Sequence, residues 1–135
     1  YWDLYYAAQE LQIRRAAVVK HWSSLVTPCE AVRVTRGELV VRDNAIRWKH
    51  VTADASSYSV SYYDDEGRRV ADTIEIPAAG VETKVPVPTL PYVVVRVVAV
   101  RREAGPKGIQ ARSAPRAAEL HIAGSDTPML VGVRH

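Results

Sequence analysis

The residues best suited to nucleophilic chemistry in this sequence are one cysteine, Cys29, and four histidines at positions 21, 50, 121 and 135. A nucleophilic site would place the thiol beside a histidine and an orienting acid. Cys29 follows Pro28 where a helical pattern gives way to a strand pattern, and no glycine-rich turn surrounds it. A lone free cysteine is commonly a small buried apolar residue. We therefore expect no catalytic residue here, and any catalysis would lie outside this chain.

Metal chemistry would need histidines or carboxylates at ligand spacing. The four histidines form no H-x-x-x-H pair, and a single cysteine builds neither a thiolate site nor an intrachain disulfide. Asp64, Asp65 and Glu66 carry carboxylates that suit calcium, but their spacing is not that of an EF-hand loop, and Gly67 makes an acidic hairpin turn the simpler interpretation. The sequence thus predicts no metal and no cofactor.

The charge of the chain is mildly positive and evenly spread. There are 18 basic and 15 acidic residues, with a formal net charge of +3. A nucleic-acid-binding protein would gather its basic residues on one face. The arginine doublets lie at 14–15, 68–69 and 101–102, and we expect the last two at turns. No run of 18 apolar residues occurs, so we expect neither a nucleic-acid partner nor a membrane span.

Residues 1–26 contain neither Gly nor Pro, which favours a helix. Asp3 is its predicted N-cap, and Thr27 with Pro28 is its predicted end. Apolar residues follow one stripe at helical spacing, interrupted by Arg15. The members of this stripe are Leu4, Ala8, Leu11, Val18, Trp22 and Leu25. The sequence thus predicts an N-terminal helical segment over residues 1–28.

This helix is unusually rich in the aromatic types that dominate interface hot spots. They are Tyr1, Trp2, Tyr5, Tyr6 and Trp22, and they do not all fit the stripe. The interpretation that we favour is that they cover an open edge or one sheet face of the following domain, because the chain has no Phe. The alternatives are a surface for a partner, or a helix that belongs to a preceding domain.

From about residue 30 the apolar period changes from 3.6 to 2, which indicates strands. Residues 31–34, 39–41 and 45–48 are short predicted strands. In the next one, Tyr58, Val60 and Tyr62 share a face and serines the other, as in a half-buried antiparallel strand. Residues 69–76 are another extended run. Residues 81–87 are interrupted by prolines, which places them at an edge or a strand end.

Residues 92–100 are the most strand-like segment, and their near-continuous apolar character predicts a central position covered on both faces over part of its length. Residues 105–108 form a predicted loop, and residues 117–122 close the series. About seven short strands with turn signals between them predict a mainly β chain, an antiparallel β-sandwich over residues 29–123. Residues 124–135 are then a C-terminal tail or an extra strand.

Residues 29–123 resemble a fibronectin type III domain. The resemblance rests on Trp48 in the second strand, on Tyr58-x-Val60-x-Tyr62 as the third, and on the alternating valines of the sixth. Tyr92 falls one residue before the position at which that family has a tyrosine, where this chain has Val93. The resemblance implies an immunoglobulin-like sandwich with a core signature of Trp48, Tyr58, Val60, Tyr62, Tyr92, Val95 and Val97.

The function that the resemblance implies is a non-catalytic structural or protein-binding module of a larger protein that is secreted or surface-associated. The N-terminal helix would contact a protein partner or a neighbouring domain. One alternative is an accessory domain appended to an enzyme such as a carbohydrate-active hydrolase, with a carbohydrate ligand. Another is a structural component of a virion or a secretion apparatus, which would form symmetric oligomers. The sequence leaves the oligomeric state open.

Overall fold

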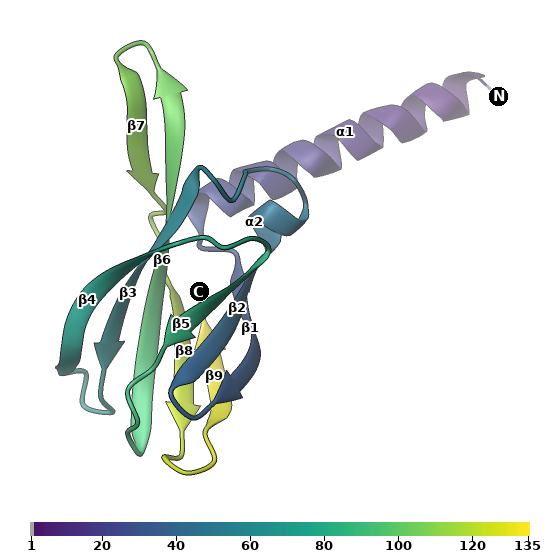
Figure 1. Cartoon of the computed structure of the whole chain (residues 1–135). Coiled ribbons are helices and arrows are strands. Elements are labelled where there is room, and N and C mark those ends of the chain that lie inside the picture. Colours follow the sequence, from purple (N-terminus) through teal and green to yellow (C-terminus); the bar gives the residue numbers. More distant parts are fainter. Residues whose placement is uncertain (1) are drawn as a thin grey trace.

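The computed structural model describes the backbone of residues 2–135 and their side chains, except those at positions 2, 16, 19, 20 and 22–24. A long helix, α1 (Trp2–Leu25), precedes two antiparallel sheets (Figure 1). The smaller sheet has the order β1-β2-β5, from β1 (Cys29–Thr35), β2 (Glu38–Asp43) and β5 (Glu82–Pro86). The predicted mainly β chain with an N-terminal helix is therefore confirmed.

The larger sheet has the order β4-β3-β6-β8-β9, and β7 pairs with the far end of β6. Its strands are β3 (Ser56–Tyr63), β4 (Arg69–Pro77), β6 (Tyr92–Gly105), β7 (Gly108–Ser113), β8 (Ala118–Ala123) and β9 (Met129–Arg134). The predicted edge position of residues 81–87 is confirmed, since β5 borders the smaller sheet. Residues 129–134 pair with β8, so this part of the C-terminal segment is a strand of the larger sheet.

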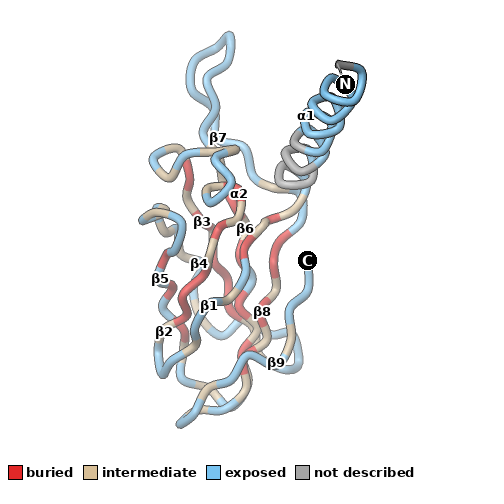
Figure 2. The backbone as a smooth tube through the Cα atoms, turned by 90° about the vertical axis from the view of Figure 1, so that its right-hand side faces the viewer, coloured by how far each residue is buried: buried red, intermediate tan, exposed pale blue. Residues whose placement is uncertain are grey.

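The core lies between the two sheets and is built mainly by alternate residues of β2, β3, β6 and β8, as the period of two predicts (Figure 2). Tyr58, Val60 and Tyr62 of β3 are buried, as are Val95 and Val97 of β6. The remaining buried members include Leu39, Val41, Val85, Val93, Ala99, Leu120 and Ile122. Burial of this apolar surface supplies most of the stabilisation of the fold.

β6 is the central strand of the larger sheet, because it pairs with β3 on one side and with β8 and β7 on the other. The central position that we predicted for this strand is confirmed. Its outward face is covered only in part, because Arg96 is exposed and Val94 and Val98 are half-buried. Beyond the sandwich, β6 continues with β7 as a hairpin that projects from the body (Figure 1). All six residues of β7 are exposed, so no core contact signals this hairpin in the sequence.

The predicted strand at residues 45–48 is wrong. These residues belong to α2 (Asn44–Arg47), a short helix whose N-cap Asp43 accepts a hydrogen bond from the backbone N–H of Ala45 at 3.0 Å. Aspartate and asparagine are common both in turns and at helix N-caps, so the sequence Asp43-Asn44 fits either structure. Trp48 follows α2 and is 51% exposed. It is therefore not a core residue, although the fibronectin type III resemblance rests partly on it.

Two smaller predictions also need correction. Asp3 is not the N-cap of α1, because the helix already includes Trp2; Asp3 lies in the first turn, where a carboxylate favours the helix dipole. Arg101 and Arg102 do not lie at a turn, because both belong to β6. Tyr92 is half-buried and outward-facing, whereas Val93 is buried, so Tyr92 is not part of the inner core.

Candidate protein-binding surface

The junction between α1 and the sandwich is held by backbone hydrogen bonds. The N–H of Thr27 donates to the carbonyl of Arg116 at 2.9 Å, and the N–H of Arg116 donates to the carbonyl of Leu25 at 3.2 Å. The Thr27 hydroxyl is buried and accepts from the N–H of Ala99 at 3.0 Å. These bonds satisfy one of the unpaired carbonyls at the end of the helix and tie its root to β6. The root thereby fixes the direction in which α1 leaves the sandwich.

Beyond this root α1 extends away from the sandwich, at the end that also carries the β6–β7 hairpin (Figures 1 and 2). Leu4 is 74% exposed, Leu11 66% and Ile13 70%. Tyr5 and Tyr6 are also exposed, and their rings meet edge to face at 5.8 Å. The expectation that the aromatic residues cover the sandwich is therefore wrong for these two tyrosines. Tyr1 and the side chains of Trp2 and Trp22 lie outside the described residues.

Exposed side chains make polar contacts in the first half of α1. Glu10 pairs with Arg14 one turn later at 2.5 Å, and both side chains are exposed, so the pair contributes little. Gln9 donates to the Tyr5 hydroxyl at 2.8 Å. In proteins most helical stability comes from the tertiary packing of an apolar face, but every side chain of α1 from residue 3 to residue 15 is exposed. Its exposed apolar side chains therefore make α1 the strongest candidate for a surface that binds another protein.

A buried polar network lies at the same end of the sandwich. The Asp43 carboxylate, fully buried at the end of β2, accepts from Arg101 at 2.7 and 3.1 Å, one bond to each oxygen. It also accepts from the Tyr58 hydroxyl at 2.6 Å and from the N–H of Ala45. Since a buried charge is tolerated only when it is paired and hydrogen-bonded, this network is structural in character.

The network changes the pKa values of the residues in it and beside it. Burial, followed by the hydrogen bond to Asp43, raises the pKa of Tyr58. Burial alone would lower the pKa of Arg101, but its hydrogen bonds to Asp43 and the charge of that carboxylate outweigh the effect and raise it. Burial and the nearby Asp43 charge also raise the pKa of the Cys29 thiol. A reactive cysteine needs the opposite shift, so Cys29 has the environment of a buried structural residue.

The sequence held a signal for this pair that the predictions missed. Side chains two residues apart along a strand share a face. Arg101 continues the inward series of residues 93, 95, 97 and 99, and Asp43 continues the series of Leu39 and Val41. Both charged residues therefore stand at inward positions of their strands, where each needs a partner.

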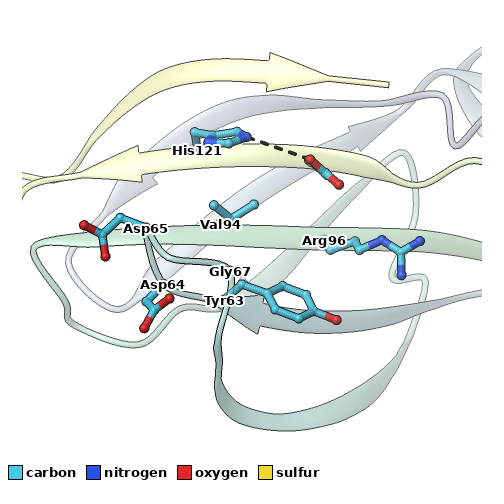
Figure 3. Close-up of a pocket in the computed structure, with 8 residues that line it drawn as sticks. Tyr63, Asp64, Asp65, Gly67, Val94, Arg96 and His121 are labelled. Carbon is cyan, nitrogen blue, oxygen red and sulfur yellow. Dashed lines mark ion pairs between the residues drawn. The ribbon is translucent and has the colours of Figure 1, made fainter.

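An open groove of about 530 Å³ lies on the outer face of the larger sheet (Figure 3). Val94 and Arg96 of β6 form its floor, between Tyr63 of β3 and His121 of β8. The Nδ1 atom of His121 lies 2.6 Å from the Tyr92 hydroxyl, and its Nε2 atom lies 3.9 Å from Glu119. The tyrosine of the sixth strand thus bonds across to β8.

At the rim of this groove, the carboxylate of Asp64 is hydrogen-bonded within its own turn. One carboxylate oxygen of Asp64 accepts from the N–H groups of Glu66 and Arg68, and the other accepts from the Arg68 side chain. These bonds lower the pKa of Asp64, those from the Arg68 backbone most. The predicted acidic turn is confirmed, with Gly67 at a φ of +80°. Within the described residues, no three His, Cys, Asp or Glu side chains gather in a way that could hold a metal ion.

Comparison with protein-family models finds no match, and comparison with curated proteins finds no relative. Among the described residues, no helix is both long enough and apolar enough to cross a membrane.

Proposed function

We propose that this chain is a non-catalytic structural or protein-binding module that contacts a protein partner or a neighbouring domain through α1. The observation that carries the proposal is the exposure of Leu4, Leu11 and Ile13 on a helix whose root is fixed to the sandwich. Exposed apolar surface of this extent is typical of an interaction site. Any catalysis would lie outside this chain.

The kinship with fibronectin type III domains belongs to the same proposal. In immunoglobulin-like sandwiches the first, second and fifth strands share one sheet, and the third, sixth and seventh share the other. The order β1-β2-β5 facing β3-β6-β8 supports this assignment, with β4 beside β3 and the β7 hairpin inserted between β6 and β8. The exposed Trp48 does not support it. A secreted or surface-associated parent protein follows from this kinship alone.

The experiment is site-specific photo-crosslinking in cells that make this protein. A photoreactive amino acid at Tyr5 or Leu11 is expected to give a discrete covalent adduct with a protein, identified by mass spectrometry. The matched control is the same amino acid at Asp72, an exposed residue of β4, which is expected to give none. Absence of an adduct from both helix positions would overturn the proposal.

A second candidate function is an accessory domain that holds carbohydrate for an attached enzyme. The exposure of Trp48 favours it, because an exposed aromatic ring offers an apolar face to a ligand. A polysaccharide pull-down that Trp48→Ala abolishes would support this candidate. A pull-down that is unchanged by Trp48→Ala, or that recovers no polysaccharide at all, would count against it.

A further inference from the structure

The exposed stripe of α1 has a seven-residue repeat. Leu4, Leu11, Val18 and Leu25 are each seven residues apart, and residues 8, 15 and 22 stand between them, each four residues after one member and three before the next. This is the heptad spacing of a left-handed coiled coil, with Leu4, Leu11, Val18 and Leu25 at the d positions. All four d side chains are exposed in the chain as it stands. The described side chains of the repeat, at positions 4, 8, 11, 15, 18 and 25, are therefore all exposed.

We propose that α1 pairs with α1 of a second copy of this chain in a parallel, two-stranded coiled coil. The inference rests on the proposed function, since it names the partner of the same helix. It extends that function from binding in general to self-association. In a parallel pair the two sandwiches lie at the same end of the coiled coil, because each follows the C-terminal end of its α1.

The area that such a pair would bury reaches the lower limit for a specific interface. Each helix offers five large exposed side chains along the stripe or beside it: Leu4, Tyr5, Leu11, Val18 and Leu25. At roughly 100 Å² for each side chain, two helices would bury about 1,000 Å². Specific interfaces begin at about this size. The helix is thus long enough to pair with a copy of itself, but the pair would be weak.

Two features of the stripe are compatible with two parallel strands. Three of the four d residues are leucine, the type found at the d positions of parallel dimers. Arg15 stands at an a position, where a single polar residue fixes register and oligomeric state at a cost in stability. In the parallel register the two Arg15 residues meet each other, so they also weaken the pair. Ile13 lies on the opposite face of the helix, although it is as exposed as Leu11.

The test is sedimentation equilibrium of the purified chain over a series of concentrations. The wild type is expected to show a reversible monomer–dimer equilibrium. Leu11→Asp places a charge in the seam and is expected to raise the dissociation constant at least about tenfold. Ile13→Asp makes the same change outside the seam, at similar exposure, and is expected to leave it unchanged. Equal effects of the two substitutions would overturn the proposal.

Two further variants are expected to form more dimer, so that a loss of folding cannot imitate the result. Arg15→Leu removes the facing charges and is expected to tighten the dimer at least about tenfold, whereas Gln9→Leu, off the seam, is expected to have no effect. Leu4→Cys should form a disulfide-linked dimer on oxidation, because parallel d positions face each other, whereas Tyr6→Cys should not. A disulfide-linked dimer of Tyr6→Cys, or a Leu4→Cys variant that stays monomeric after oxidation, would contradict the parallel register.

The failure of this inference is distinguishable from that of the proposed function. A chain that stays monomeric at every concentration, with or without Arg15→Leu, overturns self-association. If photo-crosslinking at Tyr5 then captures a different protein, the proposed function stands with another partner. If it captures a second copy of this chain, both are supported.

Discussion

Arg101 of β6 contacts both carboxylate oxygens of Asp43 at the end of β2, so one buried ion pair joins the two sheets beside the root of α1. The Tyr58 hydroxyl of β3 also donates a hydrogen bond to this carboxylate. Three strands and the N-cap of α2 therefore meet at one carboxylate. These hydrogen bonds stabilise the end of the sandwich from which the exposed helix extends.

Arg101→Met should lower the free energy of unfolding by about 3 kcal/mol, because it leaves the Asp43 charge buried without its partner. The matched control is Arg102→Met, whose exposed guanidinium donates to the backbone carbonyl of Asp54, with an expected loss below about 1 kcal/mol. Urea unfolding followed by circular dichroism measures both. Similar losses for the two variants would show that the buried pair does not hold this end.

Stability should fall at alkaline pH through the buried tyrosines. An unfolded tyrosine titrates near pH 10, whereas burial raises the pKa of Tyr62 to about 12. Between these values the folded chain keeps a proton that the unfolded chain loses. The contribution of Tyr62 to stability is therefore intact below about pH 10 and is lost as the pH rises towards 12. The raised pKa of Tyr58 acts in the same direction.

Tyr62→Phe should accordingly make the free energy of unfolding less dependent on pH between about 10 and 12. Tyr63→Phe is the matched control, since the neighbouring tyrosine is only partly buried and its pKa is lowered, chiefly by a hydrogen bond with Arg69. Urea unfolding at several alkaline pH values gives the slopes. A Tyr62→Phe slope equal to that of the wild type would contradict the assignment.

Trp48→Ala should change the free energy of unfolding by less than about 0.5 kcal/mol, because the indole is exposed after α2. Leu120→Ala, at a fully buried position of β8, should cost about 2 to 5 kcal/mol. Thermal or urea unfolding compares the two. A large loss for Trp48→Ala would place this tryptophan in the core, as the sequence resemblance had implied.

The sandwich could be predicted because its core residues alternate with a period of two, as in Tyr58, Val60 and Tyr62. That period arises from the geometry of a strand whose one face is buried, so it marks strands wherever a core exists. The β7 hairpin buries none of its own side chains and left no such signal. The Asp43 and Asn44 pair was ambiguous because turns and helix N-caps favour the same residue types.

The candidate surface was harder to predict than the fold. The sequence showed that α1 is helical and apolar, but not whether its apolar side chains face the sandwich or solvent. That choice depends on the bonds at Thr27 and Arg116, which direct the helix away from the body. Contacts between residues so far apart in the sequence leave no local pattern.

The most direct test of α1 as a binding surface is amide hydrogen exchange, resolved by mass spectrometry, at different protein concentrations. In the dilute chain, amides of α1 should exchange rapidly, because an unpacked helix frays, while amides of β3 and β6 stay protected. Protection of α1 should rise as the chain is concentrated or as the protein captured by photo-crosslinking is added. Protection of α1 equal to that of β3 at every dilution would show that the helix packs on its own sandwich and would contradict the account.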